Sequence, residues 1–190
     1  MENQLILSVD QGTTGTRASL FNLKGELIGF AYREHRQIYP KPGWVEHDPL
    51  EIIGNVYMVM KEVLEKTKID PRKIVAIGVT NQRETTVIWN PKTGKPYYNA
   101  IVWQCRRTAL LVDTLKQQHL HVIYEKTGLY PDAYFSSTKI WWLLNTKPEL
   151  REKASKGEAV FGTIDTWIIW NLTKGSKDVA TPELPQLFSL

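Results

Sequence analysis

The chain has 190 residues, of which 42% are hydrophobic and 23% are charged, so it is long enough to form a large globular domain with a buried core. Its net charge is only +4, and because we find neither a basic stripe nor a nucleic-acid-binding module, we expect no nucleic-acid partner. The single cysteine, Cys105, cannot form an internal disulfide, which is typical of the reducing cytoplasm. The N-terminus has no signal-peptide pattern and the apolar runs are too short to cross a bilayer, so we expect a cytoplasmic protein without a membrane partner.

The first third of the chain predicts an antiparallel β-meander followed by a helix. Turn residues separate three short strands: Leu5–Val9, Thr16–Asn22 and Leu27–Arg33. The helix is predicted to begin after Asp48, which can cap it, with Pro49 in the first position and Glu51 completing a capping box. We expect the helix to end near Lys66. Its buried face is predicted by apolar residues at helical spacing: Ile52, Ile53, Val56, Val59, Met60, Val63 and Leu64.

The remainder of the chain predicts alternating strands and helices. The apolar run Ile74–Thr80 is typical of a central strand that is buried on both faces. Further strands are expected at Thr85–Trp89, Ala100–Trp103 and Glu158–Phe161. Helical patterns cover 105–119, 138–156 and Thr163–Leu172. Because the order begins with a hairpin, β-β-β-α-β, it differs from a Rossmann unit, which would begin β-α-β.

The turn between the first two strands predicts a phosphate site. Asp10 ends the first strand, and Gly12, Thr13 and Thr14 follow it. Such a turn presents backbone N–H groups and hydroxyls to one small volume, and Asp10 can hold a metal ion against the same phosphate. Arg17, on the second strand, is a further phosphate partner, although a solvated strand arginine is the simpler interpretation. A surface hairpin that binds nothing remains the alternative.

A second candidate site follows the apolar strand Ile74–Thr80. Loops at strand ends commonly carry binding residues, and here Arg83 and Glu84 are adjacent. Together they offer five hydrogen-bond donors and two acceptor oxygens, which suits a small polyol. The alternative is an exposed ion pair that contributes little to stability.

Trp103 ends a predicted strand and is either the apolar wall of a pocket or a core tryptophan. Arg106 and Arg107 follow it at the expected start of a helix. Because the helix dipole disfavours cations there, this position favours a functional or ion-pairing role for the two arginines. Cys105 is interpreted as a buried thiol rather than a nucleophile.

Tyr134 lies in a polar loop that leads into a predicted helix, which either Ser136 or Ser137 can cap. Its hydroxyl is either a ligand contact or part of the structure. The four histidines lack metal-ligand spacing, so we expect no structural metal. His119 and His121 are two residues apart, which favours a loop for that segment.

Five motifs in this order and at this spacing resemble the FGGY family of carbohydrate kinases, and within it the kinases that phosphorylate glycerol. The resemblance covers residues 4–175. The motifs are Asp10-Gln11-Gly12-Thr13-Thr14, Asn81-Gln82-Arg83-Glu84-Thr85-Thr86, Tyr98-Asn99-Ala100-Ile101-Val102-Trp103-Gln104-Cys105-Arg106-Arg107-Thr108, Tyr134-Phe135-Ser136-Ser137-Thr138-Lys139 and Gly162-Thr163-Ile164-Asp165-Thr166-Trp167.

The resemblance implies an α/β fold of the ribonuclease-H-like, actin-like ATPase type, with a mixed sheet flanked by helices. Family members have two large domains and a cleft between them. Residues 1–175 are then an incomplete N-terminal kinase domain, and a second, ATP-binding domain is absent. Residues 176–190 do not follow the family pattern, and a frameshift, a pseudogene or an early stop would each explain this divergent tail. The resemblance leaves a homo-oligomer open.

The function implied by the resemblance is ATP-dependent phosphorylation of glycerol to sn-glycerol 3-phosphate with Mg²⁺. Glycerol hydroxyls would bind Arg83, Glu84 and Tyr134, and Trp103 would pack against the glycerol carbons. Asp10 would position Mg²⁺. The ATP phosphates would face four further residues of the first motif and the strand after it: Gly12, Thr13, Thr14 and Arg17.

The family's general base is an aspartate that we expect beyond residue 190, so the isolated chain is expected to turn over barely or not at all. Two alternatives stay open. The first is a related sugar kinase, such as one for a pentulose, which would need more room beside the Trp103 indole. The second is a non-catalytic remnant that only binds a ligand.

Overall fold

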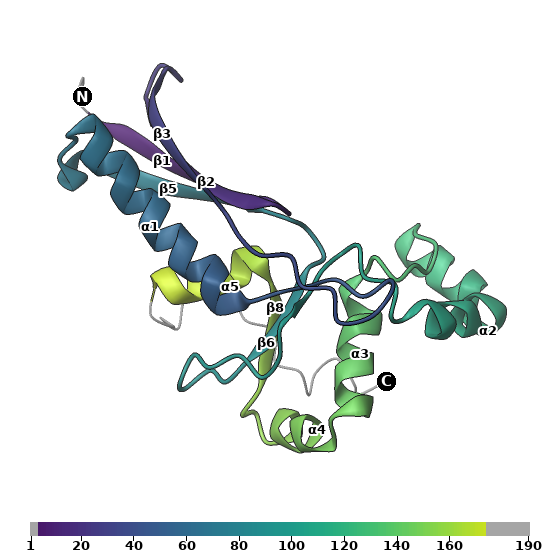
Figure 1. The fold of residues 1–190 in the computed structure, drawn as a ribbon. Coiled ribbons are helices and arrows are strands. Elements are labelled where there is room, and N and C mark those ends of the chain that lie inside the picture. Colours follow the sequence, from purple (N-terminus) through teal and green to yellow (C-terminus); the bar gives the residue numbers. More distant parts are fainter. Residues whose placement is uncertain (1–3, 174–190) are drawn as a thin grey trace. The chain divides into compact units, whose positions relative to one another are not determined.

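The computed structural model describes residues 4–173 (Figure 1). They form two compact units, each with its own sheet. Unit 1 contains residues 4–37, 47–82 and 164–173, and unit 2 contains 38–46 and 83–163. The predicted divergent tail, 176–190, lies outside the described residues. Among residues 4–173, no helix has both the length and the apolar character that a bilayer span requires.

Unit 1 is built on a four-stranded sheet in the order β3-β2-β1-β5. Its strands are β1 (Leu5–Gln11), β2 (Gly15–Asn22), β3 (Leu27–Glu34) and β5 (Ile74–Asn81). The first three are antiparallel neighbours, which confirms the predicted meander, and β5 runs parallel to β1. The mixed sheet agrees with the predicted fold class.

Helix α1 (Pro49–Thr67) covers one face of this sheet, as predicted. Its buried residues Val59 and Val63 pack with Leu7 and Leu20 of the sheet. Asp48 caps the helix, because its Oδ1 accepts the Leu50 N–H at 2.8 Å. The predicted capping box would also need the Glu51 side chain to accept the Asp48 N–H. This part of the prediction is wrong.

Glu51 bonds outside the helix instead. Its carboxylate accepts the backbone N–H and the Nε–H of Arg36, at 3.2 and 2.9 Å. Helix α5 (Ile164–Leu172) completes unit 1, as the sequence predicts. Trp167 joins it to the start of α1, since its Nε1–H donates to the Pro49 carbonyl at 2.9 Å.

The burial predicted for β5 is wrong. Within the described residues β5 is the edge strand of its sheet, and Val75 and Ile77 are 52% and 47% exposed. An apolar composition indicates what a strand can bury, but the number of neighbours decides how much of it is buried. The 3-10 turn η1 (Pro71–Lys73) precedes β5.

Unit 2 contains the sheet β4-β7-β6-β8, which consists of β4 (Glu46–His47), β7 (Ala100–Ile101), β6 (Thr86–Trp89) and β8 (Val160–Thr163). Its core includes Ile88, Ile101, Leu143 and Leu150. The predicted strand Ala100–Trp103 is shorter than expected, because Trp103 already lies in a turn. Strand β8 also begins two residues later than predicted, at Val160.

Three helices complete unit 2: α2 (Ala109–Thr127), α3 (Ser136–Thr146) and α4 (Pro148–Ser155). The pattern over 138–156 is therefore two helices. They separate at Pro148, which has no backbone N–H to continue α3. Helix α2 extends past its predicted end, so the loop expected around His119 and His121 is wrong.

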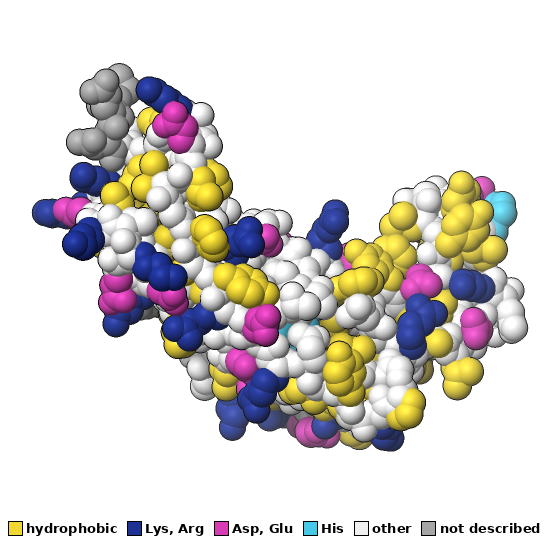
Figure 2. All heavy atoms as spheres, turned by 45° about the horizontal axis from the view of Figure 1, so that its top comes forward, with side chains coloured by type: hydrophobic (Ala, Val, Ile, Leu, Met, Phe, Trp, Pro, Cys, Tyr) yellow, Lys and Arg dark blue, Asp and Glu magenta, His cyan; other side chains and the backbone are white. Residues whose placement is uncertain are grey.

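The reason for the misplaced end of α2 is its weak amphipathic pattern. Val112 is its one buried residue, while Leu110, Val122 and Tyr124 are exposed apolar side chains. Figure 2 shows such side chains in yellow at the right, where α2 lies.

A substitution at Gly15 tests how closely β2 and β3 pack in the meander. A Cβ added there would lie 2.5 Å from the Arg33 carbonyl oxygen and from the Tyr32 hydroxyl. We expect Gly15→Ala to lower the free energy of unfolding by about 1–3 kcal/mol through overpacking. Gly54 lies inside α1 with open space at its Cβ position, so Gly54→Ala should raise that free energy by about 0.5–1 kcal/mol.

Urea denaturation of the three proteins measures both effects. Stability in Gly15→Ala equal to the wild type would contradict the close approach of β2 and β3 at this position.

Candidate functional site

The Asp10 turn in unit 1 is closed by a hydrogen bond from the Gly12 N–H to the Gly15 carbonyl, at 2.8 Å. Asp10 is exposed, and its carboxylate forms no hydrogen bond or ion pair with any residue that the structure describes. This carboxylate can therefore ligate a cation without first breaking another contact. The Gly12 N–H is already used within the turn, and the phosphate contact of Gly12 stays a prediction.

Arg17 lies directly opposite Asp10 in the β1–β2 register, but the two residues do not form an ion pair in the described part of the chain. The Arg17 guanidinium lies over the rings of Phe30 and Tyr32, at 5.3 and 6.0 Å from their centroids. This stacking across β2 and β3 accounts for Arg17 without a ligand. Its phosphate contact stays a prediction.

A buried polar network supports the Asp10 turn. The Gln82 Nε2–H group donates to Gln11 Oε1 at 2.9 Å and reaches His47 Nδ1 at 3.1 Å. His47 Nε2 lies 2.8 Å from Gln37 Oε1, and Gln37 Nε2 donates to the Thr13 carbonyl at 2.9 Å. These partners require a neutral His47 with its proton on Nε2.

Burial and the neighbouring His35 lower the pKa of His47 to about 3, which keeps this histidine neutral near pH 7. The sequence does not predict this network, because its glutamines and histidine lie on separate segments and match no motif.

The candidate polyol residues lie in unit 2, where Glu84 is anchored to helix α3. Its backbone is in the left-handed region, with φ of 63°. Its Oε2 accepts the Ser136 N–H at 2.8 Å and the Ser136 hydroxyl at 2.9 Å. The predicted serine cap is therefore wrong: the residue before α3 is Phe135, and the Glu84 carboxylate satisfies the helix terminus.

Arg83 is exposed and forms no hydrogen bond or ion pair in residues 4–173. The two neighbours therefore do not form the ion pair that was the alternative interpretation. The donors of Arg83 and the second oxygen of Glu84 remain available for other contacts.

Trp103 and Tyr134 contact each other, with ring centroids 6.0 Å apart and an interplanar angle of 69°. The Trp103 N–H donates to Thr85 Oγ1 at 3.2 Å, which ties it to the residue after Glu84. Trp103 is half-buried. The structure thus joins Glu84, Trp103 and Tyr134 in one group, while each comes from a different segment of the sequence.

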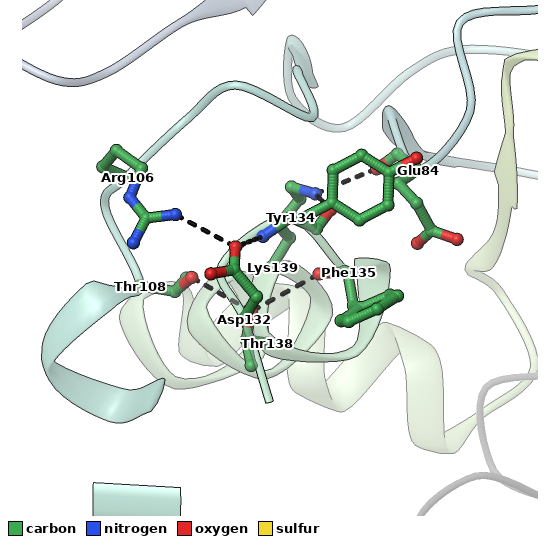
Figure 3. Close-up of polar contacts among 8 residues, drawn as sticks. All are labelled: Glu84, Arg106, Thr108, Asp132, Tyr134, Phe135, Thr138 and Lys139. Carbon is green, nitrogen blue, oxygen red and sulfur yellow. Dashed lines mark hydrogen bonds and ion pairs between the residues drawn. The ribbon is translucent and has the colours of Figure 1, made fainter. Parts of the chain in front are cut away.

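Lys139 links two members of this group (Figure 3). Its fully buried Nζ donates to the carbonyls of Glu84 and Tyr134. Burial lowers its pKa to about 8, and Glu84, Cys105 and Asp132 oppose that shift. The sequence does not predict this role, because a lysine in a helical pattern is usually solvent-exposed.

The arginines after Trp103 have the predicted ion-pairing role. The Arg107 guanidinium is buried and lies 2.6 Å from Glu46 Oε1, and the Arg106 guanidinium lies 3.0 Å from Asp132 Oδ1. Both residues precede α2, so the helix-dipole argument for them is wrong. Cys105 is buried, as predicted.

A mostly apolar pocket of about 320 Å³ borders Glu84 on the side of α2. Leu115, Ile123 and Phe135 contribute to its lining, but Arg83, Trp103 and Tyr134 do not. Its chemistry does not suit a polyol. The pocket therefore shares Glu84, but not Arg83, Trp103 or Tyr134, with the candidate polyol site.

Comparison with known proteins identifies the family. The chain belongs to the FGGY family of carbohydrate kinases, whose N-terminal domain matches residues 5–181. It is 57% identical to glycerol kinase 2 of Thermotoga maritima over 171 residues, which is 90% of this chain and 34% of that protein. It is 52% identical to glycerol kinase of Francisella philomiragia over 195 aligned residues, covering 100% of this chain and 39% of that protein.

Solved structures agree with this assignment. A crystal structure of Plasmodium falciparum glycerol kinase with ADP matches with a TM-score of 0.86 at 38% identity, covering 97% of this chain and 40% of that one. A xylulose kinase from Lactobacillus acidophilus matches with a TM-score of 0.78 at 24% identity, covering 97% and 39%, which supports the fold alone. The chain spans about a third of the length of the curated relatives it matches.

The neutral His47 predicts a pH-dependent stability. Its folded pKa, about 3, lies below the ordinary histidine value of 6.5, so the unfolded chain takes up a proton first as the pH falls. The contribution of neutral His47 to the free energy of unfolding is complete above pH 6.5. It is lost toward pH 3, by up to about 1.4 kcal/mol per pH unit. We expect His47→Gln to lose less unfolding free energy than the wild type between pH 6.5 and 4.

Denaturation at a series of pH values measures this difference. His121→Gln is the control, because that side chain is 83% exposed, and it should follow the wild type. Equal pH dependence in all three proteins would contradict the buried, neutral state of His47.

Proposed function

We propose that this chain is the N-terminal part of an ATP-dependent glycerol kinase. In the whole enzyme the γ-phosphoryl group of ATP would pass to a primary hydroxyl of glycerol, giving sn-glycerol 3-phosphate and ADP. The observation that carries the proposal is the group of Glu84, Trp103 and Tyr134 next to an unpaired Arg83. The identity to glycerol kinases supports it, and the lone, buried Cys105 is consistent with a reducing cytoplasm.

In this proposal the polar groups of unit 2 bind the hydroxyls of glycerol. Ser136 engages Oε2 of Glu84, so Oε1 is left to accept a hydroxyl proton. Arg83 donates to hydroxyl oxygens, and the Tyr134 hydroxyl can both donate and accept. The Trp103 indole packs against the carbon atoms.

The Asp10 turn binds the phosphate end of the nucleotide. Mg²⁺ in such sites uses one or two carboxylates together with phosphate oxygens and water, and the unpaired Asp10 carboxylate fits that need. No cluster of three or more acidic, histidine or cysteine ligands occurs within residues 4–173. The ligand that we propose from this part is Asp10. When bound, the ion would neutralise charge on the phosphoryl group.

Thr13 and Thr14 offer further phosphate donors in the turn, and Arg17 lies opposite Asp10 in the β1–β2 register. Phosphoryl transfer depends on positioning and charge neutralisation, and a general base must take the hydroxyl proton. We propose that this base belongs to a part of the enzyme outside these 190 residues. The 190-residue chain alone should therefore bind glycerol but turn over barely or not at all.

The substitution Arg83→Ala tests whether Arg83 binds glycerol. Each charge-assisted hydrogen bond that is lost should weaken glycerol binding by about 1.5–3 kcal/mol. Isothermal calorimetry on the chain measures this against Arg72→Ala, a control at an exposed arginine that pairs with Asp70.

Calorimetry with xylulose and ribulose distinguishes a glycerol kinase from a pentulose kinase, because a glycerol site should favour the three-carbon alcohol. Unchanged glycerol affinity in Arg83→Ala, or tighter binding of a pentulose, would contradict the proposal. A coupled assay of ADP release tests turnover, and rapid glycerol-dependent release by the chain alone would contradict the external base.

A further inference from the structure

We propose that Lys139 is the positioning residue of the glycerol site. Its side chain ties the backbones of Glu84 and Tyr134 together, so that two substrate-binding side chains from separate segments keep a fixed spacing. This inference rests on the proposed function and adds a residue that does not itself touch glycerol.

The first argument is the burial of a charged group. Lys139 is fully buried, although burying a lysine is costly unless its donors are satisfied. Both partners of its Nζ are backbone carbonyls, those of Glu84 and Tyr134. An apolar side chain would fill the same space without the desolvation cost, so the lysine is explained by what it holds.

The second argument is the backbone of Glu84. A non-glycine residue in the left-handed region is strained and persists where surrounding contacts fix it. Two contacts from α3 do so here: Lys139 holds the Glu84 carbonyl, and Ser136 holds its carboxylate. Without the lysine, the Glu84 backbone would be free to relax, and the contact of its carboxylate with the Ser136 N–H would loosen with it.

The third argument is that Tyr134 is fixed on both sides. Its N–H donates to Asp132 Oδ1 at 2.8 Å, and Asp132 is held by Arg106 at 3.0 Å. Its carbonyl accepts from Lys139. Figure 3 shows this network, in which Lys139 contacts Glu84 and Tyr134, the two residues proposed to bind the substrate.

The test compares Lys139→Met with the wild-type chain and with Lys126→Met, a control at an exposed lysine near the end of α2. Removing the charged donor should raise the dissociation constant for glycerol on the order of tenfold or more, and Lys126→Met should leave it unchanged. Amide hydrogen exchange gives an independent readout. We expect faster exchange at Tyr134 and Ser136 in Lys139→Met, with unchanged exchange in α1.

Lys139→Gln is the second variant, since it is neutral but keeps a hydrogen-bond donor, and it should give an intermediate loss of affinity. Unchanged glycerol affinity in Lys139→Met, or unchanged exchange at Tyr134 and Ser136, overturns the inference. If neither variant folds, Lys139 serves stability rather than positioning, and the inference is also overturned. If the wild-type chain binds no glycerol, the proposed function fails, while the exchange data still decide whether Lys139 holds the two segments.

Discussion

The left-handed backbone of Glu84 is the constraint on which the candidate site of unit 2 depends. At φ of 63°, the residue brings its carboxylate to the first N–H of α3 and its carbonyl to Lys139. Tyr134 shares the same lysine, and Trp103 packs edge-on against Tyr134. Helix α3 thus fixes the unusual backbone conformation of Glu84. The aromatic pair Trp103 and Tyr134 is held to the same helix through Lys139.

In unit 1 the Asp10 turn is also held through its backbone, but by neutral side chains. The carbonyl of Thr13 in the Asp10 turn is held by Gln37, which in turn contacts the buried His47. In both units a polar side chain, half-buried Gln37 or buried Lys139, fixes a loop through its backbone. Asp10 and Arg83 form no hydrogen bond or ion pair with other described residues. Such loops are preorganised, which reduces the cost of ordering them when a ligand binds.

Local patterns predicted the elements that local chemistry determines. The meander follows from its turn residues, and α1 follows from its Asp48 cap and its helical spacing. The burial of β5 could not be predicted, because it depends on neighbouring strands. The Glu84 cap of α3 and the buried Lys139 join residues 52 and 55 positions apart in the sequence. No spacing rule reports such pairs, whereas the chemistry of the residues and the resemblance to a family predicted Arg83, Glu84, Trp103 and Tyr134 as site residues.

The central claim is that these three residues form one polyol site. The most direct test is a titration of the isotope-labelled chain with glycerol, followed by nuclear magnetic resonance. The account predicts that the signals of the Glu84 amide, the Trp103 indole and the Tyr134 amide shift together with one dissociation constant, while the indole of the buried Trp167 in unit 1 does not move. Shifts that appear elsewhere, or no shift at saturating glycerol, would contradict it.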